Sequence, residues 1–212
     1  MKSTYTDPKF TKHIKGEIRT ILECGSRDCM DAIAMLSHYS PNIIYSFECN
    51  PDSIVVCEEN IKEFEKIKLI KKAVSDNDGF IDFYATDMEK SIDKNIGASS
   101  ALYHLDNKID FIQKNIKVES IKMSSFIESE YIEEIDLLCL DLQGYERFVI
   151  NGFDDHISKV KYIISEVSFK SYYENDLLFN DYVKLMDDKG FVLVDTISYG
   201  GFGDSLFKNK NN

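Results

Sequence analysis

Hydrophobic residues along this chain follow two alternating patterns. Short runs rich in β-branched and apolar residues alternate with segments whose apolar positions recur every three to four residues. This alternation predicts a parallel sheet with helices on both faces. The predicted strands occupy residues 19–24, 43–47, 67–74, 135–142 and 160–167. Four helices are expected between and after them, starting near Asp28 as N-cap, at Pro51, near Gly144 and near Leu178.

The middle and the end of the chain depart from this alternation. Residues 80–84 and 116–121 predict two strands around a polar loop, and we interpret residues 80–122 as an insertion that follows the third strand. Residues 190–198 and 204–207 predict a closing antiparallel pair. We therefore expect a single domain over residues 1–212. Its core would span residues 15–208, and residues 208–212 would form a flexible tail.

Composition narrows the class of protein. The 212 residues suit one domain, and 43% hydrophobic residues are enough for a proper core, which excludes wholesale disorder. With 25 basic and 37 acidic residues the net charge is −12, which disfavours nucleic acid and anionic membranes as partners. No apolar run approaches the roughly 18 residues of a membrane span, and the polar start does not resemble a signal peptide. A soluble, cytoplasmic protein is expected, with its five cysteines reduced and mostly buried.

Polar residues gather where the predicted strands end. In open α/β sheets, ligands bind beyond the carboxyl ends of the strands. Gly25 permits a tight turn that exposes backbone N–H groups, and Glu48 is placed to accept hydrogen bonds from two ribose hydroxyls. The sequence therefore predicts nucleoside recognition. The candidate cofactor-binding residues are Glu23, Gly25, Ser26, Glu48, Cys49, Asn50, Ser75, Asp76, Asp141 and Leu142.

The same strand ends discriminate between cofactors. A dinucleotide site needs glycines where this chain has Arg27 and Met30, which disfavours NAD. S-adenosylmethionine has no phosphate and carries an ammonium, a sulfonium and a ribose, which acidic strand ends suit better. The alternatives are a nucleoside-binding protein without catalysis and an NAD-dependent sugar oxidoreductase.

Four motifs, in order along the chain, resemble those of the FkbM-type methyltransferases: residues 23–28, 47–51, 73–79 and 135–146. The resemblance implies a Rossmann-like class I methyltransferase fold, whose seven-stranded, mostly parallel sheet has its last strand antiparallel. It also implies S-adenosylmethionine as cofactor and O-methylation of a hydroxyl on a sugar, a glycan or a related small molecule. The common first motif, Asp-x-Gly-Ala-Asn, is here Glu23-Cys24-Gly25-Ser26-Arg27. Arg27 introduces a cation able to pair with Asp28, Asp31 or an acidic substrate.

Three residues are candidate catalytic groups. Asp141, at the end of the central strand, is the first candidate for the base that activates an acceptor hydroxyl, although it could instead cap the helix expected near Gly144. Glu166 is a second candidate, as base or as a clamp on the acceptor, with a solvated strand-end carboxylate as the alternative. His104, in the insertion, is a third candidate because histidine titrates near neutral pH.

Other side chains have weaker claims to a role. Asp141 and Glu166 offer oxygen ligands for a divalent metal, but no dense ligand motif supports a metal site. Ser99 and Ser100 are candidates for contact with cofactor or acceptor, or form an ordinary polar turn. Four aromatic residues either wall a sugar-binding cleft or pack in the core. They are Phe169, Tyr172, Tyr173 and Phe179.

Overall fold

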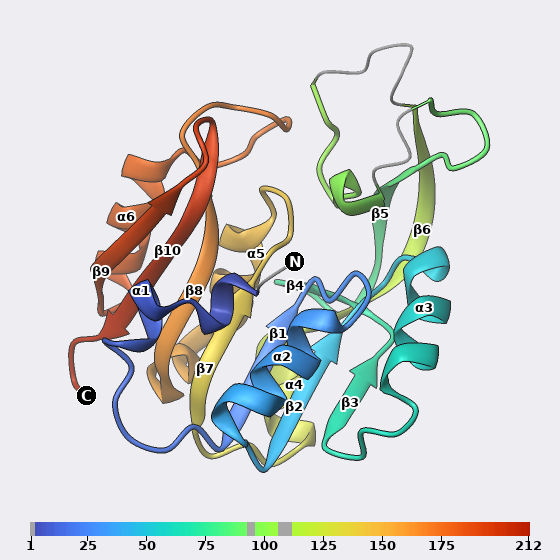
Figure 1. The fold of residues 1–212 in the computed structure, drawn as a ribbon. Helices are drawn as coiled ribbons and strands as arrows, with labels where there is room; N and C mark the ends of the chain where they lie inside the picture. The colour runs from blue at the N-terminus through green and yellow to red at the C-terminus, as the bar shows by residue number, and fades with distance from the viewer. Residues whose placement is uncertain (1–2, 93–95, 106–111) are drawn as a thin grey trace.

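A seven-stranded sheet forms the centre of the molecule (Figure 1). The computed structural model describes residues 3–92, 96–105 and 112–212. The strand order is β3-β2-β1-β7-β8-β10-β9, and β10 is antiparallel to both of its neighbours. This arrangement confirms the predicted fold class. The strands are β1 (Thr20–Cys24), β2 (Ile43–Phe47), β3 (Ile67–Ile70), β7 (Ile135–Leu140), β8 (Val160–Ser168), β9 (Phe191–Ser198) and β10 (Phe202–Asn209).

Helices cover both faces of this sheet. The α-helices are α1 (Pro8–Thr11), α2 (Met30–Tyr39), α3 (Pro51–Ile61), α4 (Met123–Ser129), α5 (Glu146–Gly152) and α6 (Phe179–Asp188). Short 3₁₀ turns are η1 (Thr4–Thr6), η2 (Ile96–Ala98) and η3 (Asp154–Lys159). None of the helices in the described part of the chain is long and apolar enough to cross a membrane.

The four predicted helices begin within two residues of their predicted starts. Helix α2 begins one residue later than a cap at Asp28 would place it, because Cys29 is the N-cap; Asp28 Oδ1 still accepts the Met30 N–H at 3.1 Å. Helix α3 begins at Pro51 as predicted, and the Asn50 side chain caps it. The helix expected near Gly144 begins two residues later, at Glu146.

The core has two layers because strand side chains alternate between faces. In β7, Leu138 and Leu140 pack in the cluster that contains residues of α4, α5 and α6, whereas Leu137 and Cys139 pack in the cluster under α1 and α2. All residues of β7 are buried, as predicted for a central strand. The cysteines are free, and all but the partly exposed Cys49 are buried.

One predicted strand is two strands. Residues 67–74 divide into β3, in the main sheet, and β4 (Ala73–Ser75), which pairs with a second sheet. Lys71 and Lys72 separate them, and Lys72 Nζ forms an ion pair with Glu119 at 2.5 Å. The chain turns at these two lysines because their charged heads stay at the surface while the apolar residues on either side enter different sheets.

The second sheet has the order β4-β6-β5, with β5 (Gly79–Thr86) antiparallel to β6 (Gln113–Lys122). It confirms the two strands predicted in this region, and both are longer than predicted. In Figure 1 this sheet stands beyond the carboxyl ends of β1, β2 and β3. It therefore forms a wall on the side where the parallel strands end.

Candidate active site

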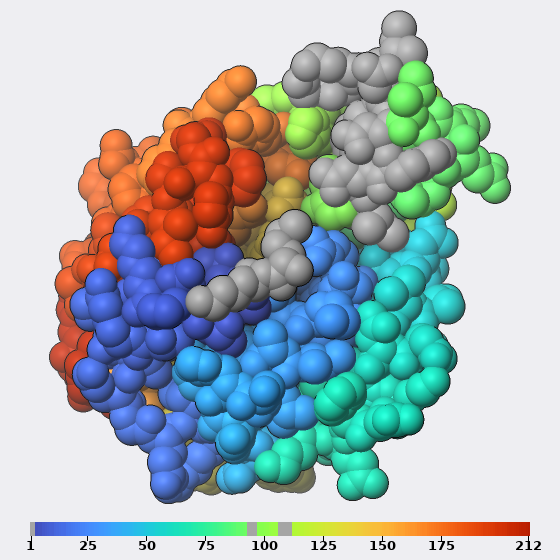
Figure 2. Space-filling view, viewed as in Figure 1, coloured from blue at the N-terminus to red at the C-terminus, as the bar shows by residue number. Residues whose placement is uncertain are grey.

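A cavity of about 600 Å³ lies between the ends of the main-sheet strands and the second sheet. Figure 2 shows the hollow between the orange and red C-terminal elements and the green second sheet. Most of the sequence-predicted site residues line it. These are Gly25, Ser26, Glu48, Cys49, Asn50, His104, Asp141, Leu142 and Glu166.

The turn after β1 approaches the end of β7 closely. Gly25 has a φ of +92°, and a Cβ added to it would lie 1.9 Å from the carbonyl oxygen of Asp141. The N–H groups of Gly25 and Ser26 both donate to the carbonyl of Phe47, each at 3.0 Å, so the expectation that this turn exposes them to a ligand was wrong. Only glycine fits this position, and the turn brings the ends of β1, β2 and β7 to one edge of the cavity.

Glu48 organises the neighbouring loops. Its Oε1 accepts the N–H groups of Cys49 and Asn50 at 2.8 Å each, and its Oε2 accepts the Arg27 N–H at 2.7 Å. Burial raises the pKa of Glu48, and these three N–H groups lower it. A carboxylate has about four acceptor positions, so Glu48 retains room for one ribose hydroxyl rather than the two expected from the sequence.

Gln143 joins the two carboxylates at the other end of the cavity. Its Nε2 donates to Asp141 Oδ1 at 2.8 Å and to Glu166 Oε2 at 3.0 Å, while its Oε1 accepts the Tyr173 hydroxyl at 2.8 Å. Gln143 was not among the site residues predicted from the sequence. Its position two residues after Asp141, in the turn that leaves the central strand, is the signal that could have indicated it. We call Asp141, Gln143, Glu166 and Tyr173 the amide-linked array.

Carboxyl groups are concentrated at this end of the cavity. Burial raises the pKa of Glu166 well above its usual range, and Asp141 raises it further. Desolvation and Asp31 raise the pKa of Asp141, whereas Gln143 and Arg27 lower it. Asp204 lies opposite Glu166 in the register of β10 and β8. Burial and the charge of Asp141 raise the pKa of Asp204 to about 7. The carboxylates of the array can therefore bind a cationic ligand group or accept a proton.

The turn from β7 to α5 is held by two side chains. Glu146 Oε1 accepts the N–H groups of Leu142 at 2.8 Å and Gly144 at 3.3 Å. Ser100 Oγ donates to the carbonyls of Leu142 at 3.2 Å and Gln143 at 2.9 Å. Ser100 is thus a structural link from the second sheet, whereas its neighbour Ser99 lines the cavity. Asp141 does not cap α5, because its carboxylate bonds the Gln143 side chain instead.

Three of the predicted cofactor-binding residues do not line the cavity. Glu23 is 1% exposed, and burial raises its pKa to about 7, although the neighbouring Ser46 and Ser26 hydroxyls lower it. The Ser75 hydroxyl lies 2.9 Å from the hydroxyl of Tyr145, the N-cap of α5, and neither Ser75 nor Asp76 lines the cavity. The residues just before them, Lys72, Ala73 and Val74, line the wall instead.

Two of the four aromatic candidates line the cavity, and the other two pack beside the core. Tyr172 and Tyr173 line the cavity, and the His104 ring packs edge-on against Tyr173 at a centroid distance of 4.9 Å. Phe169 and Phe179 pack against each other at 4.9 Å beside the main core. The cavity thus has aromatic rings on one side of the amide-linked array.

The structure gives little support for a metal site at Asp141 and Glu166. Within residues 3–92, 96–105 and 112–212, no three His, Cys, Asp or Glu side chains are grouped as metal ligands. Asp141 and Glu166, the candidates from the sequence, are joined by an amide donor instead.

Two solved methyltransferases have the same architecture. An FkbM methyltransferase from Methylobacillus flagellatus KT superposes with a TM-score of 0.55 at 9% identity, over 90% of this chain and 43% of that protein. TrmK of M. capricolum, solved with S-adenosylhomocysteine, superposes with a TM-score of 0.51 at 12% identity, over 97% of this chain and 69% of that one. At these identities the likeness establishes a methyltransferase fold.

Sequence comparison gives the family. Residues 23–193 match the Methyltransferase FkbM domain, so the chain belongs to the FkbM family of S-adenosylmethionine-dependent methyltransferases. A relative described as 2-O-methyltransferase NoeI, from Sinorhizobium fredii, is 28% identical over 194 residues, which cover 89% of this chain and 79% of that protein. Family membership supports the methyltransferase hypothesis over the NAD-dependent oxidoreductase.

Proposed function

We propose that this chain transfers a methyl group from S-adenosylmethionine to a hydroxyl of a sugar, a glycan or a related small molecule. The observation that carries the proposal is that one cavity has Glu48 at one end and the amide-linked array at the other. The acceptor class is supported by the O-methyltransferase name of the relative and by Tyr172 and Tyr173, whose rings suit the face of a sugar.

The residues present fit the methyl donor. Glu48 would accept a ribose hydroxyl, next to the turn of Gly25 and Ser26. The apolar side chains on the second-sheet side would contact the adenine. Among them are Ala73, Val74, Ile81 and Phe83. When bound, the donor supplies a methyl group activated by a sulfonium.

The chain's own residues position the acceptor and take up its proton. Asp141 would accept the hydroxyl proton as the oxygen attacks, and Gln143 would hold the Asp141 carboxylate in place. Glu166 would bind a second acceptor oxygen, because its carboxylate lies on the other side of the same amide. His104, which also lines the cavity, is the competing base.

Mass spectrometry of the purified protein tests the cofactor, with co-purified S-adenosylmethionine or S-adenosylhomocysteine as the expected finding. Formation of S-adenosylhomocysteine with a panel of glycans, small sugars and a transfer RNA then tests the acceptor. Turnover with sugars or glycans alone is expected, since the net charge of −12 disfavours RNA. Turnover with RNA alone would overturn the acceptor class, and a binding protein without catalysis would give none.

Replacing Glu48 by Gln is expected to weaken S-adenosylhomocysteine binding about 10- to 100-fold in isothermal titration. The amide loses the charge that accepts a ribose hydroxyl, and it cannot accept the Arg27 N–H and the two loop N–H groups equally well. Glu58→Gln, an equivalent change on the exposed side of α3, is the control and should leave the dissociation constant unchanged. Equal affinities for the two variants would remove Glu48 from the cofactor site.

A further inference from the structure

Positive charge is scarce around the cavity. Among its described lining residues, Arg27, Lys72 and His104 are the side chains able to carry a positive charge, beside four carboxylates. Lys72 is already paired with Glu119 of β6. Arg27 has only a long ion pair with Asp28, at 3.4 Å, and its side chain is 50% exposed. The Arg27 guanidinium is therefore the cation with the greatest capacity to bind a ligand anion.

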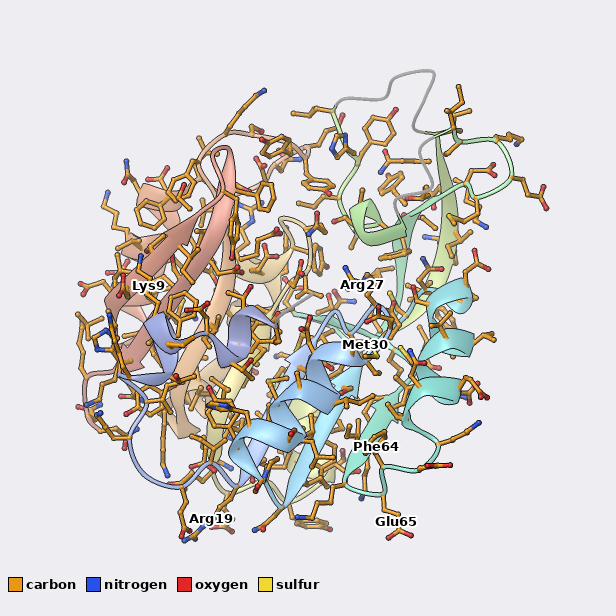
Figure 3. The ribbon with its side chains drawn as sticks, viewed as in Figure 1. Lys9, Arg19, Arg27, Met30, Phe64 and Glu65 are labelled. Carbon is orange, nitrogen blue, oxygen red and sulfur yellow. The ribbon has the colours of Figure 1, made fainter. Side chains whose placement is uncertain are left out.

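The backbone of Arg27 is anchored beside the cavity. Arg27 has a φ of +52°, in the left-handed region that Gly and Asn adopt more readily, and its N–H donates to Glu48 Oε2. Its charge also acts on Asp141. In Figure 3 the residue lies at the end of β1 that faces the second sheet, whereas Arg19 lies at the opposite end of that strand. Arg27 is thus close to both the ribose end and the array end of the cavity. Strain of this kind concentrates at functional sites.

Between the ribose and the methyl group of the donor lies the sulfur, which also carries the amino-acid chain. That chain has one anionic group, the α-carboxylate, and one ammonium. We propose that Arg27 binds the α-carboxylate of the methyl donor, an assignment that rests on the proposed function. A guanidinium matches a carboxylate with two parallel N–H donors. Asp31, in the first turn of α2, lines the same cavity and supplies the opposite charge for the ammonium.

Two thioether compounds can distinguish binding of the carboxylate from a general effect of Arg27 on the loop. S-adenosylhomocysteine carries the carboxylate, and 5′-deoxy-5′-(3-aminopropylthio)adenosine has the same nucleoside, sulfur and amine without it. Arg27→Asn keeps the backbone N–H to Glu48 and suits the left-handed conformation. Isothermal titration should show binding of S-adenosylhomocysteine weakened about tenfold or more, the usual effect of losing a charge-assisted hydrogen bond. Binding of the amine should be unchanged or tighter, because the cavity has lost a positive charge.

Two further variants complete the experiment. Arg27→Lys retains the charge but not the forked geometry, so its affinity for S-adenosylhomocysteine should lie between those of the wild type and Arg27→Asn. Arg19→Asn removes an arginine paired with Glu17 outside the cavity, and it should bind both compounds like the wild type.

Unchanged S-adenosylhomocysteine affinity in Arg27→Asn would overturn the proposal. An equal loss of affinity for both compounds would also overturn it, since it would show that Arg27 stabilises the loop and does not bind the carboxylate. If Arg27→Asn raised only the KM of an acidic acceptor, the guanidinium would belong to the acceptor site instead. Failure of the wild type to bind either compound would refute the proposed function itself.

Discussion

Replacing Asp141 by Asn is expected to lower kcat about 10²- to 10⁴-fold, measured with the acceptor found by the turnover panel. The amide cannot take the proton of the acceptor hydroxyl. Its oxygen still accepts the hydrogen bond from Gln143, so the amide-linked array keeps its shape. Affinity for S-adenosylhomocysteine, which has no sulfonium to lose a counter-charge, should change little. Asp155→Asn, on the exposed surface of η3, is the control and should keep full activity.

The pH dependence of this effect has a defined sign. Asp141 acts as a base only when ionised, and desolvation together with Asp31 raises its pKa. Wild-type kcat should therefore fall as the pH drops through that raised pKa, above the usual value near 3.9. The residual activity of Asp141→Asn should lack this acidic limb. Full activity in the variant would leave Asp141 without a catalytic role, and loss of the limb in His104→Gln would identify His104 as the base.

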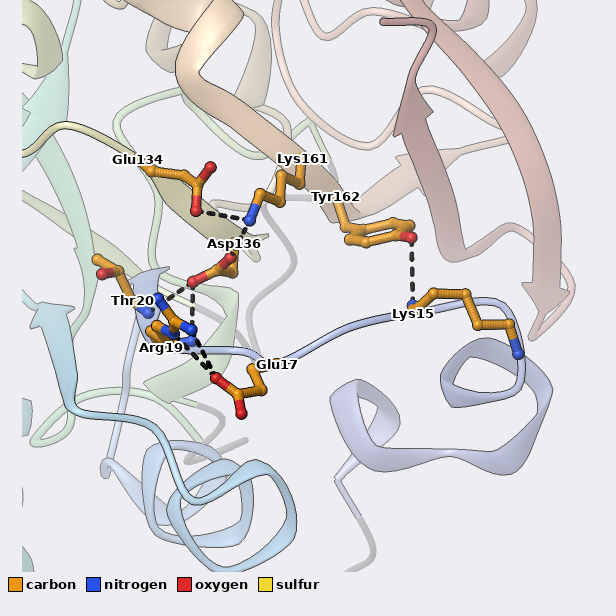
Figure 4. Close-up of polar contacts among 8 residues, drawn as sticks. All are labelled: Lys15, Glu17, Arg19, Thr20, Glu134, Asp136, Lys161 and Tyr162. Carbon is orange, nitrogen blue, oxygen red and sulfur yellow. Dashed lines mark hydrogen bonds and ion pairs between the residues drawn. The ribbon is translucent and has the colours of Figure 1, made fainter. Parts of the chain in front are cut away.

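Replacing Asp136 by Ala is expected to lower the free energy of unfolding by about 3–5 kcal/mol. Asp136 is 1% exposed at the start of β7, and its Oδ2 accepts the N–H groups of Arg19 at 2.7 Å and Thr20 at 3.0 Å. Its Oδ1 pairs with Lys161 at 2.7 Å, as Figure 4 shows. Alanine leaves two backbone donors and an ammonium without this partner where three strands meet. Urea unfolding near neutral pH measures the loss.

A matched control exists in the same network. Glu134 binds the same Lys161 at 2.5 Å but is exposed, so Glu134→Ala should lose less than about 1 kcal/mol. Burial alone would raise the pKa of Asp136, but Lys161 and the two N–H groups outweigh it and lower the pKa. The stabilisation is therefore complete above the usual pKa of aspartate and disappears as the pH falls through the lowered value. Equal losses for the two variants at neutral pH would contradict this account.

The fold was largely predictable because hydrophobic periodicity reports burial. Residues 135–142 show this well, since only the two residues after Leu140 were wrongly included in the strand. The break between β3 and β4 was not predictable in the same way. Local periodicity indicates which face of a strand each residue occupies. The sheet that a strand joins depends instead on pairing with residues 113–122, far along the chain.

The candidate site was predictable at three residues that directly follow strands of the main sheet. Gly25, Glu48 and Asp141 all reach the cavity for that reason. The contact between Gln143 and Tyr173 could not be predicted from the sequence, because their hydrogen bond joins a turn and a loop 30 residues apart. Ser75 was predicted in the cofactor site as if residues 67–74 formed one strand. The chain instead leaves the main sheet after Lys72, and the Ser75 hydroxyl lies beside that of Tyr145.

The position of β10 has a consequence for synthesis. Its eight residues lie between β8 and β9, although they are made after both. A nascent chain on the ribosome that still lacks them exposes an open edge of β8, and β9 has no strand to join. The half of the sheet that carries Glu166 thus stays incomplete until the residues of β10 have been made.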